Sequence, residues 1–111
     1  MKFLKEYWDD AIVLKGIQTV EDAPKCIKVG VQGIVVSNHG GRQQDGGVSE
    51  LGMLPMIVDA VRDELEMFFD SGIRCGADVA KALPLGAKCC LVGRPYVYGL
   101  ALVARMASVT C

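Results

Sequence analysis

The sequence lacks the features that mark several classes of protein. It has one histidine and no two cysteines separated by two residues, so a zinc site of the usual spacing cannot form. Its 12 Lys and Arg are balanced by 13 Asp and Glu and form no basic block, which argues against nucleic-acid binding. No apolar run approaches the roughly 20 residues of a membrane span, and the first residues lack the apolar core of a secretory signal. We therefore expect no metal, no nucleic-acid partner and no membrane partner.

The composition that remains is that of a folded chain. The 111 residues suffice for about one small domain, with 51% hydrophobic and 23% charged residues, 13 Gly and 4 Pro. The cysteines are odd in number and irregular in spacing, which predicts reduced thiols. We expect an intracellular protein, placed first in the cytoplasm, with peroxisomes or mitochondria as open alternatives. The five cysteines are Cys26, Cys75, Cys89, Cys90 and Cys111.

Short apolar runs alternate with segments of helical periodicity along the whole chain. Strands are expected at residues 11–15, 33–37, 67–70 and 89–92. Helices are expected at residues 19–30, 51–65, 78–85 and 96–106. The first of these helices is expected to begin with Thr19 as its N-cap and to stop at Gly30. We expect Pro84 to shorten or bend the third helix and Pro95 to occupy the first position of the fourth.

Four strand–helix units in about a hundred residues predict an α/β fold, with a parallel sheet whose strands are buried on both faces. The alternation alone leaves a doubly wound sheet and part of a barrel open. The polar residues favour the barrel, because they follow the strands: Lys15, residues 37–42, residues 70–74, and Gly93 with Arg94. A complete TIM (β/α)8 barrel needs about 250 residues. Residues 1–111 therefore look like four βα units of eight, a partial domain.

The last two of these loops each combine glycine with arginine. Glycine lets backbone N–H groups approach an anion, and an arginine fork can bind phosphate oxygens at a helix start. The plainer alternative is that these glycines only form turns and that Arg74 and Arg94 only face solvent. Two such loops after consecutive strands favour a phosphate site.

The loop from Ser37 to Arg42 is the second candidate site. His39 follows a buried strand and is flanked by small residues, where it could accept a proton near neutral pH. Arg42 could pair with a substrate carboxylate and hold it beside that base. Lys15 could stabilise an anion that develops during a reaction. The alternatives are a structural histidine and a solvated lysine.

Four motifs together resemble one family. They are Leu14-Lys-Gly16, Ser37-Asn-His-Gly-Gly-Arg-Gln43, Asp70-Ser-Gly-Ile-Arg74 and Gly93-Arg-Pro95. In this order and spacing, over about residues 8 to 104, they resemble the FMN-dependent α-hydroxy acid dehydrogenase/oxidase family, which includes glycolate oxidase, lactate oxidase and lactate 2-monooxygenase. The stretch from Gly93 to Gly99 is most similar to the lactate 2-monooxygenase-like branch.

The resemblance implies FMN as cofactor and oxidation of a small 2-hydroxy acid, of the lactate or glycolate class, to the 2-oxo acid. Oxygen or another acceptor would reoxidise the flavin, and the full-length family implies a homo-oligomer. His39 would be the catalytic base and Arg42 the partner of the substrate carboxylate, so both would bind substrate. Hydride transfer and a carbanion route both fit these residues. The implied cofactor-binding residues are Lys15, Ser37, Asp70, Ser71, Gly72, Ile73, Arg74, Gly93 and Arg94.

The chain also departs from the family pattern. The resemblance places it in the carboxyl-terminal half of the barrel, without the first four βα units and their tyrosines, second arginine and flavin contacts. Ser71 stands where glycine is common, Pro84 replaces a helix-compatible residue, and residues 105–111 leave the pattern. A truncated, inactive half-barrel with weak phosphate or flavin binding is thus the alternative function. A phosphate-binding isomerase is a third reading, which the carboxylate clamp beside a base argues against.

Overall fold

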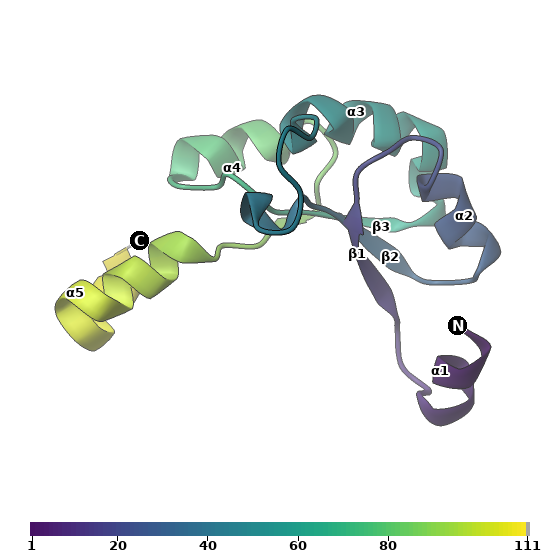
Figure 1. The fold of residues 1–111 in the computed structure, drawn as a ribbon, viewed down its shortest axis with the longest axis horizontal. Helices are drawn as coiled ribbons and strands as arrows, with labels where there is room; N and C mark the ends of the chain where they lie inside the picture. Colours follow the sequence, from purple (N-terminus) through teal and green to yellow (C-terminus); the bar gives the residue numbers. More distant parts are fainter. Residues whose placement is uncertain (111) are drawn as a thin grey trace.

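The computed structural model describes the backbone of residues 1–110 and the side chains of residues 1–102. The strands form one parallel sheet in the order β1-β2-β3-β4, as Figure 1 shows. The strands are β1 (Val13–Ile17), β2 (Gly33–Val36), β3 (Glu66–Phe69) and β4 (Cys89–Cys90). The helices are α1 (Lys2–Tyr7), α2 (Ala23–Lys28), α3 (Glu50–Val61), α4 (Gly76–Ala82) and α5 (Arg94–Thr110), with short 3₁₀-helices η1 (His39–Gly41) and η2 (Arg62–Glu64).

The winding of the chain separates the two folds that the sequence left open. Consecutive strands are neighbours throughout, without the reversal of strand order that a doubly wound sheet needs. The connecting helices α2, α3 and α4 lie on the same side of the sheet (Figure 1). This single direction of winding is that of a barrel, as predicted. The last helix, α5, extends away from the sheet instead of covering it (Figure 1).

The hydrophobic core lies between the sheet and the helices on that side. Every residue of β2 is buried, and its Ile34 and Val36 are fully enclosed. Leu54 and Ile57 of α3 and Phe69 of β3 belong to the same cluster. Because these apolar side chains fix β2 and β3 against α3, they also fix the loops that leave the two strands.

The first strand, Val13–Ile17, lies two residues later in the chain than the predicted 11–15, and it carries a bulge. The expected strand ended at Lys15, but β1 continues to Ile17, and its register with β2 shifts between Lys15 and Ile17. Gly16, at φ +97°, lies at the shift, in a conformation that glycine adopts without strain. Gly16, which the sequence predicted to end the strand, therefore forms a bulge within it, beside Lys15.

The helices begin and end at other residues than expected, for local reasons. Asp22, not Thr19, is the N-cap of α2, because Pro24 lacks an N–H and fits only the first helical turn. Thr19 instead accepts a hydrogen bond from the Asp22 backbone N–H, N to Oγ1 3.3 Å. The prediction that Pro84 shortens its helix is confirmed, since α4 ends at Ala82.

Other predicted helix boundaries were also wrong, and one helix was not predicted. The helix expected at 51–65 is α3 followed by η2, and the one expected at 96–106 is the longer α5. Pro95 is the second residue of α5, not the first. Helix α1 had no expected counterpart.

The prediction of strands buried on both faces holds only for β2. The β1 residues are exposed or half-buried, β3 alternates, and β4 has two residues in place of the expected four. Each of β1 and β4 pairs with a neighbour on one side only, so apolar residues beside β4 such as Leu91 and Val92 stay exposed. Within the described part of the chain, no helix is both long and apolar enough to cross a membrane.

Candidate functional site

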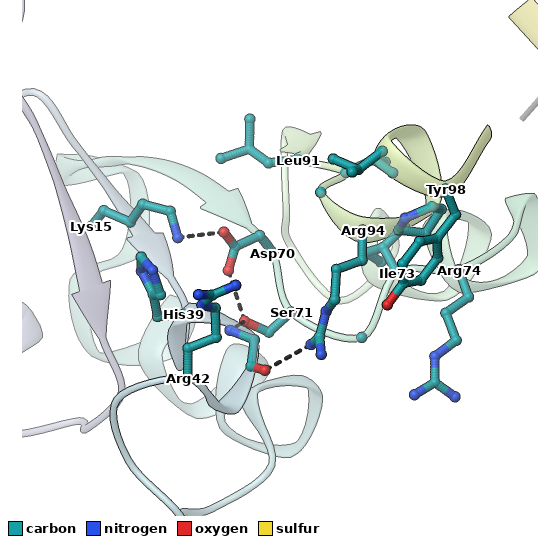
Figure 2. Close-up of a pocket in the computed structure, with 16 residues that line it drawn as sticks. Lys15, His39, Arg42, Asp70, Ser71, Ile73, Arg74, Leu91, Arg94 and Tyr98 are labelled. Atoms are coloured by element: carbon teal, nitrogen blue, oxygen red, sulfur yellow. Dashed lines mark hydrogen bonds and ion pairs between the residues drawn. The ribbon is translucent and has the colours of Figure 1, made fainter. Parts of the chain in front are cut away.

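Lys15 of β1 and the loops that follow β2, β3 and β4 surround one cavity of about 790 Å³. Lys15, His39, Arg42, Arg74 and Arg94 all line it, so the predicted gathering of these side chains at one edge is confirmed (Figure 2). Parallel strands bring their carboxyl ends to the same edge, which explains how residues far apart in sequence meet. The remaining lining residues are Gly40, Asp70, Ser71, Gly72, Ile73, Leu91, Val92, Gly93, Pro95, Val97 and Tyr98.

An ion pair occupies the wall between β1 and β3. The Lys15 ammonium pairs with the Asp70 carboxylate and donates a hydrogen bond to Ser37, Nζ to Oγ 2.7 Å. Burial raises the pKa of the Asp70 carboxyl, but hydrogen bonds from Lys15, Ser37 and Ser71 outweigh it and hold that pKa below its ordinary value of 3.8. Asp70 is therefore ionised near neutral pH and holds the lysine ammonium at the cavity wall.

Ser37 itself is 1% exposed and lies behind this wall, outside the lining of the cavity. Its hydroxyl accepts hydrogen bonds from Lys15 and from the His39 backbone N–H, the latter with N to Oγ 3.0 Å. Direct contact of Ser37 with a cofactor, as the resemblance implies, stays a prediction. In the structure, Ser37 binds two residues that line the cavity, Lys15 and His39.

The loop that carries His39 is a short 3₁₀ turn with an unusual backbone. His39 has φ +60°, and Gly40 and Gly41 also have positive φ. Such values favour glycine, so His39 is held in a conformation that few other residue types adopt readily. The Gly40 carbonyl accepts a hydrogen bond from Arg94, Nη2 to O 2.7 Å. A bond thus joins the histidine loop to the loop after β4, fifty-four residues away.

Two side chains that support this loop were missed by the sequence reasoning. Asn38 accepts a hydrogen bond from the Gly41 N–H, N to Oδ1 3.0 Å, and donates to Glu50, Nδ2 to Oε2 2.8 Å. Glu50 is 5% exposed, in the first turn of α3, and also accepts a bond from Gln18, Nε2 to Oε1 3.1 Å. An acidic residue at a helix start, after the capping-type Ser49, was the available signal. The hydrogen bond between Glu50 and Asn38 could not be predicted from the sequence.

The charge of the cavity suits an anionic ligand. Its described lining carries four cationic side chains, Lys15, Arg42, Arg74 and Arg94, against the single carboxylate of Asp70. Arg94 begins the long helix α5, where the helix dipole adds to the attraction. A guanidinium has five N–H donors, so the bond from Arg94 to Gly40 leaves donors for a ligand.

The loop of Arg74 is fixed from behind by Asp78. The Asp78 carboxylate accepts backbone hydrogen bonds from Arg74, N to Oδ2 3.0 Å, and Cys75, N to Oδ2 3.2 Å. These backbone bonds lower the pKa of Asp78 from its ordinary value. The Arg74 side chain points away from Lys15 and Asp70 (Figure 2).

The same cavity provides open backbone where a phosphate ester could approach. A Cβ atom added to Gly72 or Gly93 would meet no other atom within 4 Å, so space remains beside both glycines. Gly72 and Gly93 flank the cationic side chains of Arg74 and Arg94. The donor set and the free space together fit a phosphate-bearing cofactor such as FMN. A parallel α/β barrel segment with a cavity rich in cationic side chains at its strand ends is the class of protein that the fold and this site define.

Comparison with known proteins gives the family. The family model described as FMN-dependent dehydrogenase matches residues 1–107, and the chain belongs to that family. An FMN-dependent alpha-hydroxy acid dehydrogenase of Schizosaccharomyces pombe is 70% identical over 102 residues, which are 92% of this chain and 25% of the relative. An L-lactate dehydrogenase of Vibrio parahaemolyticus is 52% identical over 101 residues, 91% of this chain and 27% of the relative.

Solved structures agree with the fold. A Y128F variant of mandelate oxidase with a monooxide FMN adduct superposes with a TM-score of 0.93 at 47% identity, over 98% of this chain and 35% of that one. Mandelate oxidase with benzoyl-formic acid superposes with a TM-score of 0.92 at 48% identity, over 96% of this chain and 32% of that one. The chain is thus a parallel-strand segment of a TIM-barrel family, as predicted. It spans about a quarter of the length of the curated relatives it matches.

Proposed function

We propose that this chain forms the FMN-facing and substrate-facing edge of an FMN-dependent 2-hydroxy acid oxidoreductase. The observation that carries the proposal is the gathering of Lys15, His39, Arg42 and Arg94 around one cavity. The family supports the cofactor, since its model and its fission yeast member are both named for FMN. The substrate would be a small 2-hydroxy acid of the lactate or glycolate class, and oxygen or another acceptor would take the electrons.

Each cavity residue has a role that its charge and position support. Arg42 pairs with the substrate carboxylate through two parallel hydrogen bonds, which places the α-carbon beside His39. The His39 imidazole accepts a proton as the hydroxyl-bearing carbon is oxidised to the carbonyl of the 2-oxo acid. Bound FMN supplies the acceptor for the two electrons.

The remaining cations hold the cofactor. Lys15 offers a positive charge where negative charge develops on reduction, and its pairing with Asp70 keeps the ammonium at the wall. Arg94 and Arg74, with the open backbone at Gly72 and Gly93, bind the phosphate. The alternative of an inactive half-barrel with weak phosphate binding is favoured by one observation, the exposed apolar residues Leu91 and Val92 beside the free edge of β4, which pairs with β3 alone.

A chimera tests the proposal in a chain of full family length. The matched segment of the fission yeast relative is replaced by residues 1–107 of this chain, and FMN content and anaerobic flavin bleaching are measured. We expect bound FMN that loses its visible absorbance when lactate or glycolate is added. A chimera that folds but binds no FMN would contradict the assignment of FMN as cofactor. One that holds FMN but is bleached by no 2-hydroxy acid would support the inactive alternative.

A further inference from the structure

The hydroxyl of Ser71 joins the two loops that carry Asp70 and His39. Its Oγ accepts hydrogen bonds from the backbone N–H groups of Asn38 and Gly40, each with N to Oγ 3.2 Å. It also donates to the Asp70 carboxylate, Oγ to Oδ1 2.8 Å. A serine hydroxyl has one donor hydrogen and two acceptor lone pairs, so these three bonds use its full capacity. The Ser71 hydroxyl is therefore fully occupied as a link between loops, and a contact of Ser71 with a cofactor through its backbone stays a prediction.

The backbone at both ends of this link is strained. Ser71 has φ +78° and His39 has φ +60°, both in the left-handed region that non-glycine residues enter at a cost. A residue stays in such a conformation only when its surroundings determine it. At Ser71 the three hydrogen bonds of the side chain provide that determination. The strained residue His39 lies between Asn38 and Gly40, whose N–H groups donate to Ser71.

The opposite side of the loop is held independently. The Asn38 side chain donates a hydrogen bond to the buried Glu50 of α3. The same side chain accepts a hydrogen bond from the Gly41 N–H. Ser37 accepts the His39 N–H. Consecutive backbone N–H groups from Asn38 to Gly41 thus all donate to a side-chain oxygen, and Ser71 receives two of them.

We propose that Ser71 is a positioning residue for His39. Its hydroxyl binds the amides of Asn38 and Gly40, on either side of His39, and so holds the left-handed turn of residues 39–41 that places the imidazole at the cavity. It also ties that turn to the Asp70–Lys15 ion pair. The meaning of this role for catalysis rests on the proposed function of His39. The mechanical role does not, because it follows from hydrogen bonds within the chain.

Hydrogen exchange of residues 33–41 within the full-length chimera tests the mechanical role. Ser71→Ala removes the hydroxyl and keeps a side chain at positive φ, whereas Ser71→Gly removes the hydroxyl and relieves the strain. We expect the amides of residues 38–41 to exchange about tenfold faster in both variants, since a net hydrogen bond is worth roughly one decade. Residues 33–36 of β2 should keep the exchange rate of the parent. Ser49→Ala, which removes an exposed hydroxyl that caps nothing, is the matched control and should change neither segment.

Two results would overturn the proposal. One is unchanged exchange of residues 38–41 in Ser71→Gly. The other is an equal rise in β2 of that variant, which would mean a general structural role. Ser71→Gly decides the matter if Ser71→Ala fails to fold, because glycine accepts φ +78° without strain.

The imidazole of His39, the single histidine of residues 1–111, gives a second readout in the chimera, where its signals are those that His39→Gln removes. In a ¹H–¹³C spectrum, we expect Ser71→Gly to shift and broaden the His39 ring signals, and Ser49→Ala to leave them in place. In the chimera, Ser71→Gly should lower the limiting rate of flavin bleaching and leave the KM for lactate and the FMN content near those of the parent. Faster loop exchange and altered ring signals without a slower bleaching rate would uphold Ser71 as the tether and reject His39 as the base. Ring signals that match the parent would reject the tether.

Discussion

Asp70 is the residue on which the charges of the cavity wall depend. It pairs with Lys15, accepts a hydrogen bond from Ser71, and is largely shielded from solvent, with 15% of its side chain exposed. Its pKa lies below the ordinary value because these partners outweigh burial. A carboxyl whose pKa is lower in the folded state stabilises that state above its unfolded pKa, and the stabilisation is lost as pH falls through the folded pKa.

Asp70→Asn should therefore remove a pH-dependent part of the stability. We expect the parent chain to exceed the variant in free energy of unfolding by a constant amount from neutral pH down to about pH 4. Below the ordinary value of 3.8, the difference should shrink as Asp70 takes up its proton. Urea unfolding of the chimera with and without Asp70→Asn, followed by circular dichroism over this range, measures it. A difference that stays constant below that value would show that the ion pair does not lower the pKa of Asp70.

Arg42 is predicted to act through the shape of its guanidinium. Arg42→Lys keeps the charge but loses the two-pronged contact with a carboxylate, so the substrate is bound more weakly and its α-carbon is misplaced. In the chimera we expect a KM for lactate raised about tenfold or more, with FMN retained. Arg62→Lys, on the turn between α3 and β3, is the matched control and should match the parent. An unchanged KM in Arg42→Lys would remove Arg42 from the substrate site.

At the scale of elements, the loop between α4 and β4 passes close against α3. A Cβ atom on Gly86 would lie 2.7 Å from Cγ2 and 2.9 Å from Cγ1 of Val58, and Gly86 has φ +109°. Both the contact and the backbone angle require glycine here. This close approach sets how α4 leads into β4, and hence where Arg94 begins α5.

Gly86→Ala should destabilise the chain by about 2 kcal/mol or more, from overpacking and a strained backbone together. Gly76→Ala is the control, since Gly76 begins α4 and an added Cβ there meets no atom within 4 Å. Alanine is the better helix former, so the control should be neutral or slightly stabilising. Urea midpoints of the two variants, each made in the chimera, give the comparison. Equal midpoints would show that α3 can move away from Gly86.

The comparison of sequence and structure is clearest at this scale. The strand–helix alternation predicted the parallel sheet because short runs of β-branched residues, such as residues 34–36, are typical of strands buried on both faces. The strand-end rule then predicted the cavity with Lys15, His39, Arg42, Arg74 and Arg94. What could not be predicted depends on contacts between distant segments: the bulge at Gly16, the bond from Asn38 to Glu50, and the burial of Ser37 behind Lys15.

As a whole molecule, the chain is an open sheet with two free edges. Its radius of gyration is 15.2 Å, whereas a compact domain of this length has about 13 Å. The helices at its ends expose large apolar side chains, among them Phe3 and Tyr7 of α1 and Tyr98 and Leu102 of α5. Unpaired strand edges and exposed apolar surface both favour association.

We therefore predict that the isolated chain self-associates, aggregates or stays partly molten. Sedimentation velocity over a range of concentrations measures the association, and calorimetry measures whether the chain unfolds cooperatively. Leu102→Glu places a charge on an 82% exposed leucine of α5 and should weaken association. Val48→Glu, in a loop outside the helices, is the matched control and should not. A monodisperse monomer with a sharp cooperative melt would contradict the open-sheet account.

The most direct measurement of the central claim is the rate of anaerobic flavin bleaching by lactate in the chimera, with and without His39. We predict that His39→Gln keeps its FMN, because the imidazole acts on the substrate and not on the phosphate. It should lose about 10²–10⁴-fold in bleaching rate, the usual worth of a general base. If the variant bleaches as fast as the parent chimera, His39 is not the base, and the function proposed for this edge of the barrel is wrong.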